Sequence, residues 1–323
     1  MPAGGPDGPA SPGGEPGPVR VEVCATSANL GPGFDCLGLA LDLRDTMEAR
    51  FTDDGEVTVE VHGQGAGTVP TDASNLVARV VHTGLATFDE SGQLSGRGVQ
   101  LRCANAIPHS RGLGSSAAAI VGGLTLAAHL AGAADELTAA QLLALATRLE
   151  GHPDNVAAGV LGGATIAWME SGDAGSVGRA ARYPVHPDVV PLLVVPSAEA
   201  STAAARVALP SVVDHADAAF NAGRSALLVH ALSREPGLLL AATEDRLHQQ
   251  QRRAVYPESL RLVDLLRAGG VAAAISGAGP SVIAFAIDGS GVELAARLTD
   301  LAGSDSEVLM PGVADVGVRV TWA

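Results

Sequence analysis

A glycine-rich turn that runs directly into a long uncharged segment is the feature that most restricts how this chain folds. The turn extends from Pro108 to Ser116, and residues 117–130 hold no Asp, Glu, Lys or Arg. Gly112 and Gly114 allow backbone conformations that expose consecutive N–H groups, and paired serines then open a helix. The first-turn N–H groups and the dipole of such a helix form an anion site. The segment therefore predicts a phosphate-binding loop.

An ordinary glycine turn with a serine N-cap is the alternative for this pattern. It would be preferred for a single Gly-x-Gly, but here the glycines, the paired serines and a run of alanines coincide. Small alanines also let the helix pack close beneath a ligand. The residues predicted to hold phosphate groups are Pro108, His109, Ser110, Arg111, Gly112, Leu113, Gly114, Ser115 and Ser116.

The chain contains no lysine, so all 20 residues counted as Lys or Arg are arginine. This excludes a Walker lysine, a protein-kinase strand lysine and every Schiff-base mechanism. If the protein handles a nucleoside triphosphate, backbone N–H groups, a helix dipole, Mg²⁺ and arginine must hold the phosphates.

Charge and hydropathy exclude other classes of partner. The net charge is −15 and no basic stripe appears, which argues against nucleic acid as a partner. The longest apolar stretch is shorter than the roughly 20 residues that a membrane span needs. The three cysteines, Cys24, Cys36 and Cys103, lack metal-type spacing and indicate free thiols in a reducing cytoplasm.

The length of 323 residues suits two domains that share a cleft. Residues 1–18 are mostly Pro, Gly, Ala and Ser and predict a disordered tail. The order of the predicted strands and helices favours an α+β fold with two lobes. We place the lobes at residues 19–175 and 176–323, with a linker in the glycine- and serine-containing stretch from Glu170 to His186.

Apolar spacing predicts individual elements along the chain. Among the helices, one covers Asn75 to Thr87 with Ser74 as its N-cap, and another covers Pro236 to His248. Among the strands, one covers Leu37 to Leu43.

The segment Pro108–Ala119 resembles the second motif of the GHMP kinases, a family that includes galactokinase, homoserine kinase and mevalonate kinase. The resemblance implies that this loop cradles the phosphates of ATP and that Ser116 coordinates Mg²⁺. The segment Ala25-Thr-Ser-Ala-Asn29-Leu-Gly-Pro-Gly-Phe-Asp35 is similar to the first motif of the homoserine kinases in this family. By that resemblance Asn29 and Asp35 contact an amino-acid substrate, and a carboxylate is suited to pair an α-ammonium group.

Ile275-Ser-Gly277-Ala-Gly279-Pro-Ser281 resembles the third family motif, a glycine turn that closes over the nucleotide site. A plain hairpin connection between two apolar strands is the alternative. The presence of the other motifs favours a site role for Gly277 and Gly279.

Glu150-Gly-His152-Pro-Asp154-Asn155 follows a predicted helix. A carboxylate at a helix C-terminus is unfavourable for the helix dipole unless a cation lies there. The family resemblance implies that Glu150 completes the Mg²⁺ site with Ser116. It also implies that His152, Asp154 and Asn155 lie on the substrate side, with Asp154 and Asn155 closest to the reaction. Whether a general base exists is left open.

Two arginines match family segments that bind a substrate carboxylate. They are Arg206, shortly before Leu209-Pro210, and Arg252, shortly before Tyr256-Pro257. Together they would clamp an α-carboxylate.

The resemblance implies a ribosomal-S5-like N-terminal lobe and a ferredoxin-like C-terminal lobe. It implies transfer of the γ-phosphoryl group of ATP to L-homoserine with Mg²⁺. Another GHMP kinase acting on mevalonate or a sugar is one alternative, and a non-catalytic ligand-binding relative is another. Family members are often homodimers, but nothing in this sequence fixes the assembly.

Overall fold

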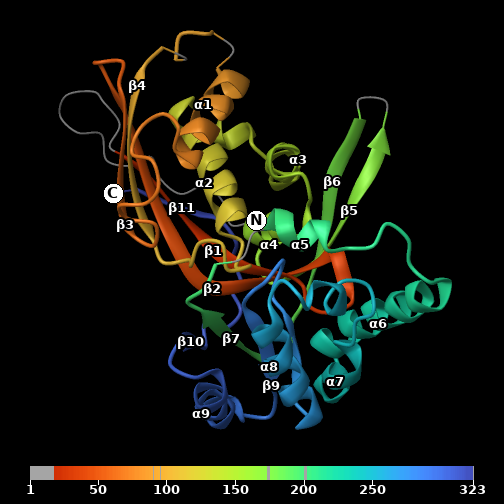
Figure 1. Ribbon diagram of the computed structural model, residues 1–323. Helices are drawn as coiled ribbons and strands as arrows, with labels where there is room; N and C mark the ends of the chain where they lie inside the picture. Colours follow the sequence, from red (N-terminus) through yellow and green to blue (C-terminus); the bar gives the residue numbers. More distant parts are fainter. Residues whose placement is uncertain (1–17, 90, 95, 173–174, 200–201, 323) are drawn as a thin grey trace.

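The computed structural model describes residues 18–89, 91–94, 96–172, 175–199 and 202–322. Of the predicted tail, residues 1–17 lie outside the described residues. The chain forms two α+β lobes, each built on its own sheet, as Figure 1 shows. The predicted fold class is thereby confirmed.

The larger sheet has the strand order β11-β1-β2-β4-β3, and β5 extends it by pairing with β2 and β6. Its strands are β1 (Val19–Asn29), β2 (Gly33–Thr52), β3 (Val57–Gly63), β4 (Gly98–Asn105), β5 (Ala164–Gly172), β6 (Gly175–Tyr183) and β11 (Arg319–Trp322). Neighbours pair antiparallel except β3 and β4, which are parallel. The strand predicted at Leu37–Leu43 is one part of the 20-residue β2.

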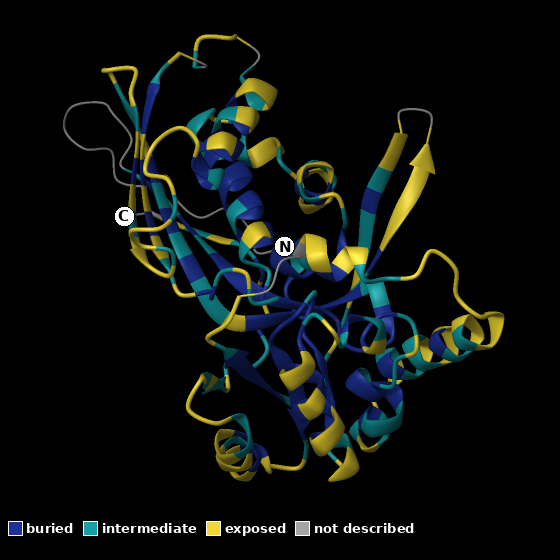
Figure 2. Ribbon diagram, viewed as in Figure 1, coloured by how far each residue is buried: buried dark blue, intermediate teal, exposed yellow. Residues whose placement is uncertain are grey.

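Three helices pack on this sheet: α2 (Ser115–Leu130), α3 (Ala139–Glu150) and α4 (Asp154–Leu161). A further helix, α1 (Leu76–Phe88), packs against α2. A short 3₁₀ turn, η1 (Ala134–Glu136), links α2 to α3. Most of α2 is buried, as the dark blue ribbon in Figure 2 shows. This helix contacts β1, α1, α3 and α4, which explains why its sequence is apolar on every side.

The smaller sheet has the order β10-β7-β9-β8, with every pair antiparallel. Its strands are β7 (Val190–Pro196), β8 (Ala272–Ile275), β9 (Val282–Ala286) and β10 (Ser306–Leu309). With α8 (Pro257–Ala268) between β7 and β8, and α9 (Gly291–Ala302) between β9 and β10, this is the ferredoxin-like arrangement expected of the second lobe.

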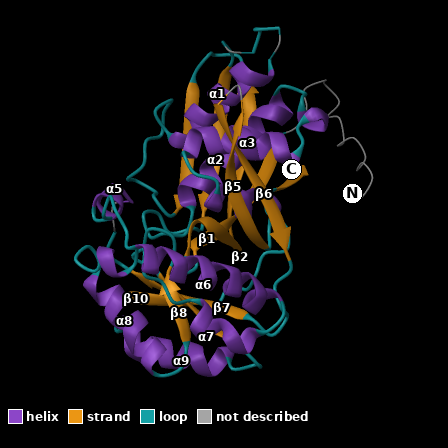
Figure 3. Ribbon diagram, turned by 90° about the vertical axis from the view of Figure 1, so that its right-hand side faces the viewer, coloured by secondary structure: helices purple, strands orange, loops and turns teal. Residues whose placement is uncertain are grey.

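The smaller sheet is buried on both faces. One face packs against α8 and α9. The other packs against α6 (His215–Ser233), α7 (Leu239–Ala242) and the core of the first lobe. Figure 3 shows the sheet between these helices. Burial on both sides explains the uninterrupted apolar sequence of β7, β8 and β9. The remaining elements are α5 (Thr202–Val207) and two 3₁₀ turns, η2 (Pro236–Leu238) and η3 (Gln250–Arg252).

Three local predictions are wrong. The stretch from Glu170 to His186 is not a linker, because most of it belongs to the β5–β6 hairpin of the first sheet. The N-cap of α1 is Asn75, whose side chain accepts from Val77 N–H, whereas Ser74 donates to Asp72. Residues 236–248 form only η2 and α7, since the chain then turns through residues held by Asp245.

The predicted lobe limits remain a prediction. The boundary at 175/176 falls at the start of β6, which pairs with β5, and β11 returns from the end of the chain to pair with β1. The sheets therefore favour a first lobe made of two separate stretches of sequence. No helix among the described residues is long and apolar enough to cross a membrane.

Candidate active site

A cavity of about 190 Å³ lies where the two lobes meet, and most of the predicted site residues line it. Its lining is polar on the side of the first lobe and includes two arginines on the side of the second. The predicted residues found there are Asn29, Asp35, Ser110, Gly112, Leu113, Gly114, Ser115, Ser116, Glu150, His152, Asp154, Asn155, Arg206, Arg252 and Gly277. Segments separated by more than two hundred residues in sequence thus line the same cavity.

The predicted phosphate loop forms the connection between β4 and α2. Gly114 is the N-cap of α2 with φ of 72°, and no side chain caps this helix end. A Cβ on Gly114 would lie 1.9 Å from Thr26 Oγ1, so both the backbone angle and the available space require glycine. The N-terminus of α2 therefore opens toward the cavity and offers its N–H groups to an anion.

The glycine turn after β8 packs directly onto this loop. The Ser276 hydroxyl donates to the Gly112 carbonyl at 2.7 Å, and Gly277 N–H donates to Ala28 O at 3.0 Å. Asn29 Nδ2 donates to Gly277 O at 2.8 Å. The three predicted motifs are therefore held together by hydrogen bonds around the cavity.

The two predicted metal ligands lie next to each other. Ser116 Oγ donates to Glu150 Oε2 at 2.8 Å, from the first turn of α2 to the last residue of α3. Gly151 follows with φ of 93° and ends α3. A hydroxyl and a carboxylate beside an open cavity are oxygen ligands that suit Mg²⁺.

A short network links the residues after Glu150. Asp154 is 2% exposed, and its Oδ1 accepts from Asn155 N–H at 2.7 Å and lies 2.9 Å from His152 Nδ1. This hydrogen bond to Asp154 raises the pKa of His152. Asp154 is the first residue of α4, a helix that the sequence did not suggest.

Thr26 supports the site from outside the cavity lining, and sequence reasoning missed it. Its hydroxyl donates to Asn155 Oδ1 at 2.8 Å and so holds the side chain that faces the cavity. It occupies an interior position of β1, where a threonine is ordinary, and no signal in the sequence marks it.

Asp35 and Arg206 face each other across the cavity mouth. Arg206 Nη2 lies 3.4 Å from Asp35 Oδ1, and both side chains are about two-fifths exposed, at 45% and 39%. Asp35 N–H donates to Asn29 Oδ1 at 2.9 Å, which fixes the turn that carries the carboxylate. This exposed pair leaves both groups accessible to a charged ligand.

Arg252 is a buried cation that faces the cavity. The residue is 2% exposed. Its Nε donates to Ala205 O at 2.9 Å and its Nη1 to His248 Nδ1 at 3.1 Å. Among the described residues no carboxylate lies within salt-bridge distance of Arg252. Its other neighbour is the Phe34 ring, whose centroid lies 5.5 Å from Arg252 Cζ. A buried guanidinium without a carboxylate partner is costly by several kcal/mol, and an anion in the cavity would offset that cost.

Four predicted phosphate or nucleotide residues do not line this cavity. Arg111 points away from it: the guanidinium donates to the carbonyls of Pro196 and Ser197 and pairs with Glu199 at 3.0 Å. It ties the loop to β7 and is not free for a phosphate. Of the others, Pro108 and His109 begin the loop and Gly279 belongs to the glycine turn after β8; His109 lines a neighbouring cavity.

That neighbouring cavity, about 340 Å³, shares Ser110, Ser115 and Ser116 with the first. It lies between α1, α2 and the sheet, and its lining is largely apolar. The apolar members are Met47, Val61, Val69, Pro70, Leu76, Val77, Cys103 and Ala119.

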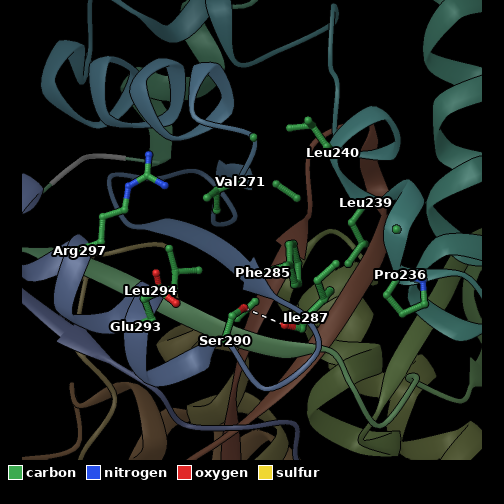
Figure 4. A pocket seen from close by; sticks show the side chains of 14 residues that line it. Pro236, Leu239, Leu240, Val271, Phe285, Ile287, Ser290, Glu293, Leu294 and Arg297 are labelled. Carbon is green, nitrogen blue, oxygen red and sulfur yellow. Dashed lines mark hydrogen bonds between the residues drawn. The ribbon is translucent and has the colours of Figure 1, made fainter.

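Another cavity, about 250 Å³, lies in the second lobe and is shown in Figure 4. Leu239, Phe285 and Leu294 form much of its wall, with Glu293 and Arg297 at α9. None of the predicted site residues lines it. Neither the phosphate loop nor the predicted metal ligands reach it.

Comparison with known proteins identifies the family of the chain. Residues 75–163 match the GHMP kinases N terminal domain, and residues 227–299 match the GHMP kinases C terminal family. The chain belongs to the GHMP kinases, a class of phosphotransferases built on this two-lobed fold.

Within this class the chain belongs to the homoserine kinase family. It is 50% identical over 303 residues to the homoserine kinase of Streptomyces coelicolor, covering 94% of each chain. It is 48% identical over 311 residues to that of Rhodococcus erythropolis, covering 94% of this chain and 96% of the relative. The crystal structure of homoserine kinase from Cytophaga hutchinsonii superposes with a TM-score of 0.79 at 26% identity, covering 94% and 97% of the two chains.

Proposed function

We propose that this protein transfers the γ-phosphoryl group of ATP to the side-chain hydroxyl of L-homoserine, giving O-phospho-L-homoserine and ADP, in threonine biosynthesis. The observation that carries the proposal is that the buried Arg252 and the accessible Asp35 line the same cavity as the phosphate loop. A cation and a carboxylate at that place suit the α-carboxylate and α-ammonium groups of an amino acid. The hydroxyl of such a ligand would then point toward Asp154 and Asn155.

The nucleotide would lie across the two neighbouring cavities. The polyphosphate would rest on the N-terminus of α2, where Gly112 and Gly114 leave room for close backbone approach. The base would enter the largely apolar cavity that shares Ser115 and Ser116 with the first. This arrangement needs no lysine, in keeping with a chain that has none.

Ser116 and Glu150 would hold Mg²⁺ together with the phosphates. No group of three or more His, Cys, Asp or Glu side chains among the described residues is arranged as a metal cage. That fits Mg²⁺, which in nucleotide sites is usually held by one or two protein oxygens and the substrate phosphates. When bound, the ion neutralises charge on the transferred group.

The protein residues act mainly by positioning. Asp154 Oδ1 already accepts from the Asn155 N–H and contacts His152, so Oδ2 is the oxygen that would meet the acceptor hydroxyl. Thr26 holds Asn155, whose amide would orient the same hydroxyl. Holding the hydroxyl in line with the γ-phosphorus supplies most of the catalysis in such transfers.

Two alternatives compete with this function. Mevalonate has a carboxylate but no ammonium group, and a neutral sugar has neither, so both leave Asp35 or Arg252 unused. A non-catalytic binding protein would not need Ser116 and Glu150 paired beside a phosphate loop. We propose a cytoplasmic enzyme, which agrees with three free cysteines; a homodimer remains a prediction from the family resemblance.

The test is an ADP-release assay with Mg²⁺ and ATP, in which L-homoserine, mevalonate, galactose and no acceptor are compared. We expect turnover with L-homoserine well above the other three, and its loss on addition of excess EDTA. Turnover with mevalonate or galactose instead would reject the substrate and keep the phosphate site. ATP binding without turnover of any acceptor would favour the binding-protein alternative.

A further inference from the structure

A fully buried histidine joins the substrate segment of the first lobe to the buried arginine of the second. His248 has an exposed fraction of 0% and lies in the turn between α7 and η3. Its Nε2 lies 2.7 Å from Gly31 O, and its Nδ1 lies 3.1 Å from Arg252 Nη1. The Phe34 ring packs beside it, with ring centroids 5.0 Å apart. The role proposed above for the site does not use this residue.

The partners of His248 determine its protonation. A carbonyl only accepts hydrogen bonds, so Nε2 must carry the proton that Gly31 O receives. A guanidinium only donates, so Nδ1 must be the unprotonated acceptor for Arg252. The ring is therefore neutral, in the Nε2–H form. Burial lowers the pKa of His248, and Arg252 acts in the same direction, whereas Asp245, 3.8 Å away, and the hydrogen bond to Gly31 O oppose this effect.

The surrounding contacts hold the ring in one place. The buried side chain of Asp245 accepts from the backbone N–H groups of His248 and Gln249 at 3.1 and 2.8 Å. Asn221 of α6 donates to Asp245 at 2.9 Å. Asp245 thus fixes the backbone at His248, and Asn221 holds Asp245 in place.

The turn that receives His248 is also tightly packed. A Cβ on Gly31 would lie 2.4 Å from Thr243 O, and Ser225 donates to Pro32 O at 2.8 Å. Asn29 and Asp35, on either side of this turn, contact each other through a hydrogen bond at 2.9 Å. A shift of the turn would therefore move the groups expected to bind the substrate ammonium.

We infer that His248 is a positioning residue that sets the distance between the ammonium-binding turn around Gly31 and the carboxylate-binding guanidinium of Arg252. One ring nitrogen holds each half of the amino-acid site, so the side chain acts as a spacer of fixed length. It touches no reacting atom. The inference rests on the proposed function, because it assumes an acceptor that carries both an ammonium and a carboxylate.

Two substitutions separate the two contacts. His248→Gln keeps a donor near the Nε2 position for Gly31 O but has no acceptor at Nδ1. His248→Asn keeps an acceptor near Nδ1 but does not reach Gly31. His215→Gln, at an exposed histidine at the start of α6, is the matched control. For each variant we would measure kcat, KM for L-homoserine, KM for ATP and the Tm. The inhibition constant of 3-aminopropan-1-ol, which is homoserine without its carboxylate, completes the set.

We expect His248→Gln to raise KM for L-homoserine at least tenfold, with kcat and KM for ATP within about twofold of the unchanged protein. Its inhibition constant for 3-aminopropan-1-ol should stay unchanged, since Arg252 does not contact that compound. His248→Asn should weaken binding of both compounds, because the Gly31 contact is lost. The control should match the unchanged protein.

An equal loss for L-homoserine, ATP and 3-aminopropan-1-ol in both variants would overturn the inference, since it would mean that His248 only supports the fold. No change in KM for L-homoserine would overturn it as well. If the unchanged protein turns over L-homoserine, these outcomes leave the proposed function intact. If it does not, the proposed function fails first and the inference falls with it.

Discussion

The two halves of the site are built in different ways. The phosphate half consists of backbone groups at the start of α2, positioned by glycines within one short stretch of sequence. The amino-acid half consists of charged side chains from β2, α5 and η3, held by buried partners such as His248 and Ala205. A backbone site depends on local conformation and space. A side-chain site depends on distant segments being brought together.

The largest effect should come from breaking the backbone half. Gly114→Ala places a methyl group against Thr26 Oγ1 and strains a left-handed residue, so the start of α2 must shift. We expect kcat/KM to fall on the order of 10²–10³-fold, the range seen when a charge-stabilising donor is lost. Steady-state kinetics of the Gly114→Ala variant and of the unchanged protein measure this fall in kcat/KM.

The control for that change is Gly132→Ala. Gly132 has a φ of 71°, close to that of Gly114, but no atom lies within 4 Å of the added Cβ. It should cost stability through backbone strain alone, about 1–2 kcal/mol, and leave activity intact. Equal loss of activity in both variants would mean that strain, and not the geometry of the phosphate loop, limits the enzyme.

An intermediate effect should follow from removing the buried cation of the amino-acid half. Arg252→Met should raise KM for L-homoserine by roughly 100-fold, since losing one partner of a buried charge pair costs about 2–5 kcal/mol. KM for ATP should hardly change. Arg253→Met is the matched control, because the neighbouring Arg253 is 41% exposed and pairs with Asp264 instead. A rise in KM for ATP as large as that for L-homoserine would remove the distinction between the two halves.

The smallest effect should be a pH dependence of stability that arises from the His152–Asp154 pair, which lies outside both halves as defined but lines the same cavity. The pKa of His152 is raised by its hydrogen bond to Asp154, so the folded state favours the protonated ring. Its contribution should be fully present below the ordinary histidine pKa of about 6.5 and be lost as the pH rises through the folded-state pKa.

Urea unfolding of the unchanged protein and of His152→Asn, at several pH values, measures this contribution. The difference in the free energy of unfolding should shrink with increasing pH. A difference that grows with pH would mean that the neutral ring is the stabilising form and that the hydrogen bond to Asp154 does not favour the protonated ring.

The contrast between the halves also explains what the sequence could predict. The phosphate loop could be recognised because its glycines and serines are adjacent, and the apolar α2 follows at once. The β6 strand was missed because its glycine, serine and arginine residues lack the apolar alternation of a half-buried strand. The length of β2 was missed because Asp42, Arg44 and Asp45 interrupt its apolar pattern.

The amino-acid half was predicted through family resemblance, which named Arg252 without its surroundings. Nothing local in the sequence indicates that His248 would be fully buried, or that Thr26 would hold a residue 129 positions away. Such contacts form between segments that are distant in sequence. The residue pattern within one segment does not show which other segment packs against it. The structure was needed to find the residues that support the site.

The pairing of β11 with β1 determines which fragments of the chain can fold by themselves. Val19 pairs with Trp322, so the larger sheet is built from two separate stretches of sequence, with the strands of the smaller sheet between them. A fragment that ends after β6 would expose the outer edge of β1, with its N–H and C=O groups free to join strands of other molecules. Such a fragment should aggregate, whereas a short linker from β6 to β11 would restore the missing edge and offer a route to an isolated first lobe.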